Sequence, residues 1–569
     1  MKWKKRDECM TIDDVIKRNI GEFKENYPET KVVNLSEAVE RIYVAIQTGE
    51  LITIFGDYDA DGVTGAAILW ATIRIMSGTA PVIRLPRRFS EGYGFSMTAA
   101  DEMDEGLLIT VDNGISAFEP IKAVKDKGMS VIVLDHHLPD ERMPEADIIV
   151  DPHCFKHEPD DFEDWCGSGL AYRVCKELLK KLGNDVLRAR TNAYIQQLAA
   201  VGTVCDVVPL VRDNRMIVIN GLKSINMMPC KGIAAMLSIT GTTYVDETTC
   251  GYLIGPMLNA SGRMEDDGAL RSFDVLTACN REGADDLEST VGVLATLNDR
   301  RKADVSDAME IARQEITETV PRGAYPFIIR NDSIGEGIVG IIAGKIAEEY
   351  KVPTFVFTSI GNGLLKGSAR SFGSVHIKQM MDAASKVIKS YGGHAGAGGL
   401  IVHEDDLFAL YTMIHRYIGD YKAEISDTIE YDLEIDAADI TAAYTAISRY
   451  RPFGEGNPNI VFKVNKFVLC PRKGECFRKM GSNKEHIKFF GNKFSAIGFD
   501  MADRFDESIG KTVTCVGTLT ENNYRGYSEI QVEMRDFKVS NDTKDTELTK
   551  KLKEKLIALG ISNDERKVV

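Results

Sequence analysis

The sequence has no apolar run that approaches the roughly 20 residues needed to span a lipid bilayer. Its first residues, MKWKKRDECM, are basic but are not followed by the apolar stretch of a secretory signal peptide. Its 11 cysteines are scattered and include no CxxC pair, which is typical of reduced thiols rather than of a disulfide framework. We therefore expect a soluble protein of the cytoplasm.

The sequence also lacks an excess of positive charge. Its net charge of −16 argues against nonspecific binding of nucleic acid over the whole surface, although a local basic groove is compatible with it. The remaining composition is that of a globular protein, with 44% hydrophobic and 27% charged residues. A chain of 569 residues is long enough for about three or four domains.

The most informative stretch is IFGDYDADGVT, at residues 54–64. It follows a short β-branched run that is typical of a buried strand, and it precedes an apolar, helix-like segment. Asp57, Asp59 and Asp61 alternate in the turn between, so an extended turn places their carboxylates on one side. Clustered carboxylates repel one another unless a positive group, usually a divalent metal ion, lies among them. For such a motif alone, a solvated acidic turn is the alternative interpretation.

Strands and helices alternate from residue 51 to about residue 210, which predicts an α/β domain with a doubly wound parallel sheet. Functional residues of such sheets collect beyond the carboxyl ends of the strands. Three expected strands end directly in acids or imidazoles, and a fourth acid follows a helical run. The residues concerned are Asp57, Asp59, Asp61, Asp112, Asp135, His136, His137 and Asp206. We expect them to form one site.

Two later segments carry polar residues between glycines. GPMLNASGRM lies in a mainly helical region and presents Asn259 and Arg263 in what we expect to be a loop. KGSARSFG and GGHAGAGG lie in a second, smaller α/β unit and present Arg370, Ser371 and His394. Backbone N–H groups and charged side chains in such loops suit contact with phosphate. Helix capping and tight turns explain the same residues equally well.

Short strands and turns from about residue 430 to 540 predict a small β-barrel or sandwich. Its segment 466–488 interleaves basic residues with phenylalanines, which suits single-stranded nucleic acid, although a solvated hairpin is an equal alternative.

The sequence pattern divides the chain into six expected parts. They are a helical extension over 1–48, the parallel-sheet domain over 49–225, a helical region with a connecting helix over 226–320, the smaller α/β domain over 321–425, the barrel over 426–542 and a charged tail over 543–569.

The motifs GDYDADG, VDNG, DHH and CDVVPL resemble those of the DHH phosphoesterase superfamily, and GSARS with GGHAGAGG resembles its companion DHHA1 domain. PRRFSEGYGF, CGSGLAYRV, GPMLNASGR and PFGEGNPNIVF narrow the resemblance to RecJ-type single-strand-specific exonucleases, whose barrel is an OB-fold. The resemblance covers about residues 45–540. One departure is Met257, which replaces an arginine of the family pattern.

The resemblance implies hydrolysis by two ions of Mn²⁺ or Mg²⁺, which stabilise the attacking and leaving oxygens of a phosphodiester. It implies metal ligation by Asp59, Asp61, Asp112, His136 and Asp206, catalytic roles for Asp57 and His137, and DNA contacts by Arg88, Asn259, Arg263, Arg370, Ser371 and His394. One ion would lie between Asp59 and Asp112, and Asp112 would bridge to the other. The implied activity is 5′→3′ release of 5′-mononucleotides from single-stranded DNA in repair and recombination, with a helicase and a single-strand-binding protein as candidate partners.

Two other functions are compatible with parts of this pattern. Members of the superfamily that hydrolyse pyrophosphate, short oligoribonucleotides or cyclic dinucleotides typically lack the barrel, so its presence over 426–542 argues against them. A noncatalytic DNA-binding scaffold would have lost metal ligands, whereas every expected acid and His136 are present here.

Overall fold

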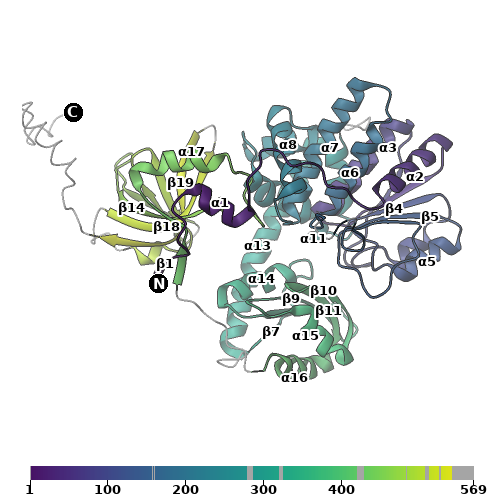
Figure 1. Cartoon of the computed structure of the whole chain (residues 1–569). Helices are drawn as coiled ribbons and strands as arrows, with labels where there is room; N and C mark the ends of the chain where they lie inside the picture. The colour runs from purple at the N-terminus through teal and green to yellow at the C-terminus, as the bar shows by residue number, and fades with distance from the viewer. Residues whose placement is uncertain are drawn as a thin grey trace, which may run out of the picture. The chain divides into compact units, whose positions relative to one another are not determined.

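The computed structural model describes residues 2–156, 158, 161–278, 286–319, 325–419, 428–481, 483–505, 512–524 and 527–540 (Figure 1). The chain divides into two compact units. One comprises Lys24–Ile425 with Gly454–Asn457, and the other comprises Met1–Phe23, Ser426–Phe453 and Pro458–Val569. No helix within the described residues has both the length and the apolar character needed to cross a membrane.

The larger unit begins with a five-stranded parallel sheet in the order β3-β2-β4-β5-β6. Its strands are β2 (Ile52–Phe55), β3 (Val82–Arg84), β4 (Leu107–Val111), β5 (Ser130–Leu134) and β6 (Ile148–Val150). The central strands carry apolar side chains on both faces because helices cover both faces. The doubly wound parallel sheet predicted from the sequence is thereby confirmed.

Two hydrophobic cores flank this sheet. Ile54, Ile109 and Ile132 face one core, to which α2, α3, α6 and α7 contribute, whereas Leu108 and Val131 face a second core with α4 and α5. The helices are α2 (Leu35–Thr48), α3 (Ala60–Ser77), α4 (Met97–Asp101), α5 (Phe118–Asp126), α6 (Gly167–Leu179) and α7 (Asp185–Cys205). Packing on both faces fixes the sheet, so the loops beyond its carboxyl edge start from rigid positions.

Helices continue the larger unit from α8 to α13. They are α8 (Arg212–Met227), α9 (Lys231–Thr240), α10 (Glu247–Thr249), α11 (Gly255–Met264), α12 (Ala269–Thr277) and the 33-residue α13 (Leu287–Thr319), with a π-helical turn at Cys250–Ile254. The loop that we expected at GPMLNASGRM is instead the helix α11. Its glycines and serine made it resemble a loop, but Pro256 lies in its first turn, where proline favours a helix start.

A second α/β domain completes the larger unit. Its five-stranded mixed sheet has the order β10-β11-β9-β8-β7, in which only β7 and β8 run parallel. The strands are β7 (Phe327–Arg330), β8 (Thr354–Ser359), β9 (Leu364–Arg370), β10 (Ile388–Gly393) and β11 (Ala397–His403), and the helices are α14 (Val339–Tyr350), α15 (Ile377–Ala383) and α16 (Leu407–Ile418). Arg370 ends β9, and His394 lies in the turn between β10 and β11.

The smaller unit contains a seven-stranded sheet in the order β13-β14-β18-β19-β17-β16-β15, with α17 (Ile440–Ser448) beside it. Its strands are β13 (Leu433–Asp436), β14 (Val461–Val468), β15 (Phe477–Met480), β16 (His486–Phe490), β17 (Phe494–Gly498), β18 (Thr512–Tyr524) and β19 (Tyr527–Ser540). Phe467 of the basic segment and Phe489 and Phe490 directly after it are at most 9% exposed and build the core, whereas Phe477 is half-buried. The three buried rings cannot stack on bases.

The N-terminal segment differs from the helical extension that we expected over residues 1–48. Residues Lys2–Lys5 form β1, which pairs in parallel with β12 (Thr428–Tyr431), and α1 (Ile12–Ile20) packs into the core of the smaller unit. The buried carboxylate of Asp432 accepts ion pairs from both Arg6 and Arg18. The first 23 residues thus belong to the smaller unit, and only α2 belongs to the parallel-sheet domain.

Candidate metal centre and nucleic-acid site

Acidic side chains gather at the carboxyl edge of the parallel sheet. Asp57 and Asp59 follow β2, Asp112 follows β4, and Asp206 caps the C-terminal end of α7. Ligand atoms in the set Asp57, Asp59 and Asp112 lie within 4.8 Å of one another, as do those in the set Asp61, His136 and Asp206. The structure therefore brings together the five residues that we predicted as metal ligands.

Helix starts fix the acids that follow β2. Asp59 is the N-cap of α3 and accepts hydrogen bonds from the backbone N–H groups of Asp61 and Gly62. Asp61 points to the start of α6, where the N–H groups of Gly167 and Ser168 donate to its carboxylate at 2.6 and 3.0 Å. The positive end of the α6 dipole thus stabilises the Asp61 charge.

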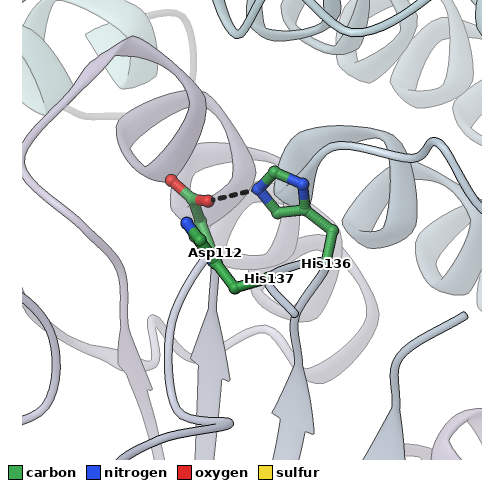
Figure 2. A group of neighbouring side chains, drawn as sticks. All are labelled: Asp112, His136 and His137. Atoms are coloured by element: carbon green, nitrogen blue, oxygen red, sulfur yellow. Dashed lines mark hydrogen bonds and ion pairs between the residues drawn. The ribbon is translucent and has the colours of Figure 1, made fainter. Parts of the chain in front are cut away.

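Asp112 occupies the centre of the cluster. Its backbone is left-handed, with φ at 63°, and its N–H donates to the carbonyl oxygen of Leu134 on β5. A Cβ atom on Gly167 would lie 2.5 Å from the Asp112 Cβ atom, so only glycine fits beside it. Asp112 Oδ1 lies 3.0 Å from His136 Nε2, and Asp206 Oδ2 lies 3.7 Å from the same nitrogen. The dashed line in Figure 2 marks the contact between Asp112 and His136.

The electrostatics of the cluster favour a bound cation. Burial, together with the negative charges of neighbouring aspartates, raises the pKa values of Asp57, Asp112 and Asp206 well above the ordinary range. Burial, and then the charge of His137, lowers the pKa of His136, which leaves its imidazole neutral and able to ligate. Asp57 Oδ1 is buried without a hydrogen-bond partner among the described residues. Several carboxylate oxygens with one imidazole fit Mn²⁺ or Mg²⁺.

His137 is held differently from His136. Its Nδ1 atom lies 2.7 Å from Asp135 Oδ1, and its Nε2 atom lies 3.0 Å from the Tyr93 hydroxyl. Burial opposes protonation, but Asp135 outweighs it and raises the pKa of His137 to about 9. Asp135 also accepts the N–H groups of Ile115 and His136. His137 is therefore a positively charged side chain in a fixed orientation beside Asp112.

Arginines form a second charged group. Arg88 lies over the ring of Tyr58 at 4.3 Å, and burial followed by the charge of Arg88 lowers the pKa of Arg263 to about 10. Arg370 donates to Ser368 Oγ and to a backbone carbonyl. Arg301 of α13 also acts on Arg263 and donates to Asn298. None of these four arginines forms an ion pair within the described residues, so they remain available to an anion.

The other predicted DNA contacts have backbone partners. Asn259 Oδ1 accepts the N–H of Ala60 at 2.7 Å and so ties α11 to the first turn of α3. The Ser371 hydroxyl donates to the carbonyl of Val375, and the Ser371 N–H donates to Gly396 in the β10–β11 turn. Burial, and then the charge of Arg370, lowers the pKa of His394. Asn259 thus holds α11 against α3, and Ser371 holds the end of β9 against the β10–β11 turn, whereas His394 lies exposed near Arg370.

Comparison with known proteins bears on this arrangement. Family models match the N-terminal domain of the DHH family over residues 51–203, the DHHA1 domain over residues 322–420 and the RecJ OB domain over residues 431–536. The single-stranded-DNA-specific exonuclease RecJ of Dickeya dadantii is 30% identical over 535 residues, which cover 88% of this chain and 89% of that relative. The chain belongs to the RecJ family.

Other RecJ proteins agree with this assignment. The RecJ exonuclease of Bacillus subtilis is 29% identical over 90% of this chain, and the chain spans 64% of that relative's length. The crystal structure of RecJ from Thermus thermophilus in complex with Mn²⁺ matches with a TM-score of 0.75 and 25% identity, over 92% of this chain and 75% of that one. The predicted family and fold are confirmed, and a solved relative binds a divalent ion.

The sequence motifs gave an incomplete account of two residues, Met257 and Arg301. Met257, which replaces an arginine of the RecJ pattern, is 2% exposed and packs in the core of the larger unit. Arg301 was missed, because its surroundings NDRRK look like any solvated helix surface. Only the fold brings Arg301 beside Arg263, so no local signal in the sequence could have found it.

The start of α14 and the residues just before it lie close to both Arg263 and Arg370. A Cβ atom on Gly337 would lie 1.9 Å from the Arg263 carbonyl oxygen, and one on Gly340 would lie 3.1 Å from Arg370 Nη2. Gly337→Ala should therefore displace Arg263 and slow the cleavage of single-stranded DNA by about 10-fold or more, which corresponds to a loss of about 1.4 kcal/mol.

Gly335→Ala is the matched control for this prediction, because a Cβ atom there would approach no atom more closely than 3.9 Å. Single-turnover rates and the shift in melting temperature with Mn²⁺ are compared for both variants. Equal rates for the two variants would contradict the role of this close approach, and loss of the Mn²⁺ shift in Gly337→Ala would mean that the damage is not local.

Proposed function

We propose that this protein is a metal-dependent, single-strand-specific DNA exonuclease that releases 5′-mononucleotides in the 5′→3′ direction and acts in DNA repair and recombination. The observation that carries the proposal is the pairing of two opposite charge clusters in one unit. Buried aspartates with His136 can hold cations, and arginines without ion pairs can hold a phosphate chain. Similarity to RecJ exonucleases selects single-stranded DNA as that chain.

Each acid has an assigned place in this proposal. Asp59 and Asp112 would hold one ion, and Asp61, Asp112, His136 and Asp206 would hold the other, with Asp57 beside them. Divalent ions held there would acidify a water molecule and stabilise charge on the attacking and leaving oxygens. The positive His137 side chain, anchored by Asp135, neutralises charge on the phosphate under attack. The bond that breaks joins phosphorus to the 3′ oxygen of the terminal nucleotide.

In this proposal the arginines set the direction of cleavage. A 5′-terminal phosphate carries more charge than an internal diester, and an arginine fork can bind it through two parallel hydrogen bonds. Arg263 and Arg370 come from different domains, and Arg88 and Arg301 add positive charge next to Arg263. With His394, they form the site for the 5′ end and the backbone that follows it. Asn259 and Ser371 keep this site in place.

The barrel unit holds the incoming strand in this proposal. Because a single-strand-specific enzyme depends on strand separation, a helicase and a single-strand-binding protein are its candidate partners. The cytoplasm is the proposed compartment, since no disulfide joins the cysteines in the described part of the chain, as in a reducing environment.

The test uses oligonucleotides labelled at the 5′ or the 3′ end, single-stranded or duplex, with Mn²⁺ or with EDTA. We expect the 5′ label to appear at once as a mononucleotide, the 3′-labelled strand to shorten gradually, and the duplex and the EDTA reactions to stay intact. Asp112→Asn protein purified in the same way controls for contaminating nucleases. Release from the 3′ end, internal cuts, or hydrolysis of pyrophosphate and dinucleotides alone would reject the proposal.

A further inference from the structure

The strand β1 gives the smaller unit a basic edge that lies far in sequence from the predicted interface. It runs parallel to β12 with Lys2 opposite Thr428 and Lys4 opposite Glu430. Trp3 fastens the strand to β19, because its indole N–H donates to Asp536 Oδ2 at 2.6 Å. Lys538 of β19 lies 4.2 Å from the centre of the Trp3 ring. In Figure 1, β1 lies at the end of the chain marked N.

The positive charges of this edge have no acidic partners. Lys2, Lys4 and Lys538 are exposed, and none of them forms an ion pair with a carboxylate of the described residues. The acids nearby are occupied, since Asp536 pairs with Arg504 and Glu430 pairs with Arg6. In a chain with a net charge of −16, such a group of free lysines is a distinct local feature.

The predicted interface at 466–488 is partly occupied by contacts within the protein. Four of its basic side chains are neutralised by acids of the same unit: Lys466 by Asp436, Arg472 by Glu529, Arg478 by Glu475 and Lys488 by Glu529. Phe467 and, directly after the segment, Phe489 and Phe490 build the core and cannot stack on bases. Of the seven lysines and arginines over 466–488, Lys473, Lys479 and Lys484 form no ion pair with a described carboxylate.

We propose that Lys2 and Lys4 of β1, together with Lys538, bind the phosphate backbone of single-stranded DNA. Alternate residues of a strand are about 6.6 Å apart and point to the same side, so Lys2 and Lys4 project together toward an extended chain of phosphates. Lys538 adds a third positive charge beside Trp3. Such contacts track the backbone without reading bases. This inference rests on the proposed function, which supplies single-stranded DNA as the ligand.

The test compares two triple variants, each of which removes three positive charges. Lys2→Gln, Lys4→Gln and Lys538→Gln remove the free lysines, whereas Lys463→Gln, Lys466→Gln and Arg478→Gln remove side chains already paired with acids. Both are made in an Asp112→Asn background, so that binding is measured without cleavage, and no tag is left at the N-terminus. Affinity for a fluorescent 40-nucleotide strand is measured from 50 to 300 mM salt.

Each phosphate contact on a single strand contributes about 0.7 to the slope of log affinity against log salt, or about fivefold at 0.1 M. We therefore expect the first triple variant to lose about 100-fold in affinity at 0.1 M salt and about 2 from the slope. The second triple variant should change both quantities far less. Equal losses in both variants, a larger loss in the second, or no loss in the first would overturn the inference.

The same measurements separate this inference from the proposed function. If unmodified protein cleaves single strands but the lysine variant binds normally, only the inference fails. If unmodified protein cleaves no strand, the proposed function fails regardless of the lysines. An equal loss of affinity for duplex DNA in the first variant would show a general polyanion surface and would also overturn the assignment to single strands. Melting temperatures of both variants verify that the fold is intact.

Discussion

Asp112→Asn is expected to slow the cleavage of single-stranded DNA at saturating Mn²⁺ by about 1,000-fold or more. The amide keeps the shape of the side chain but removes the charge next to His136, whose Nε2 atom lies 3.0 Å away. In our assignment this carboxylate serves both ions, so its loss should remove about 4 kcal/mol of transition-state stabilisation. Single-turnover rates with excess enzyme measure the chemical step directly.

Without metal, the same replacement should stabilise the folded protein. Burial and the charges of Asp61 and Asp59 raise the pKa of Asp112 well above its ordinary value. A carboxylate whose pKa is raised by folding destabilises the folded state as pH rises through its unfolded-state value, so at neutral pH its removal is stabilising. In EDTA the variant should therefore melt at a higher temperature than the unmodified protein, and with Mn²⁺ at a lower one.

Asp126→Asn is the control, because Asp126 is an exposed aspartate at the end of α5 that pairs only with Lys122 in the described structure. It should change neither the cleavage rate nor the Mn²⁺-dependent shift in melting temperature. Full activity of Asp112→Asn at saturating Mn²⁺ would refute the metal assignment. So would an equal Mn²⁺ shift in the variant and the unmodified protein.

The candidate metal site could be predicted from the sequence because most of its residues lie in short local motifs, and a parallel sheet brings such motifs to one edge. Asp57, Asp112 and His136 lie just beyond short apolar strands, and parallel strands place such positions on one edge. Asp206 instead follows a helical run. The acid cluster of Asp57, Asp59 and Asp112 confirms this reasoning at the level of geometry. What the pattern could not show is how each acid is held, such as the contact between Asp61 and the start of α6.

Other features could not be predicted, because they depend on contacts between residues that are distant in sequence. Trp3 reaches Asp536 across more than 500 residues, so nothing near MKWKK predicts a strand there. The sequence also led us to expect a loop where α11 forms. Glycine and serine lower the helix propensity of this segment, but packing against α12 and α13 overrides that propensity. The burial of Phe467, Phe489 and Phe490 could not be predicted for a similar reason, because alternation of phenylalanine with lysine fits both a barrel core and a stacking surface.

The second large effect concerns the end of the DNA strand. Arg263→Ala and Arg370→Ala should each slow the cleavage of 5′-phosphorylated single strands by about 100-fold, and the cleavage of 5′-hydroxyl strands much less. A charged hydrogen-bonded contact contributes about 1.5–3 kcal/mol, and 2.7 kcal/mol corresponds to a factor of about 100. Both arginines lack ion pairs among the described residues, so their removal leaves no buried carboxylate unpaired.

The comparison needs single-turnover rates for both kinds of 5′ end with each variant. Arg370→Lys should keep part of the effect, because lysine preserves the charge but not the planar fork. Arg188→Ala, which removes an exposed arginine of α7 paired with Asp185, is the control and should leave the ratio of the two rates unchanged. The shift in melting temperature with Mn²⁺ should persist in all four variants, since none removes a proposed ligand. If the unmodified protein does not distinguish the two 5′ ends, or if Arg263→Ala and Arg370→Ala keep the full preference, these arginines do not set the direction of cleavage.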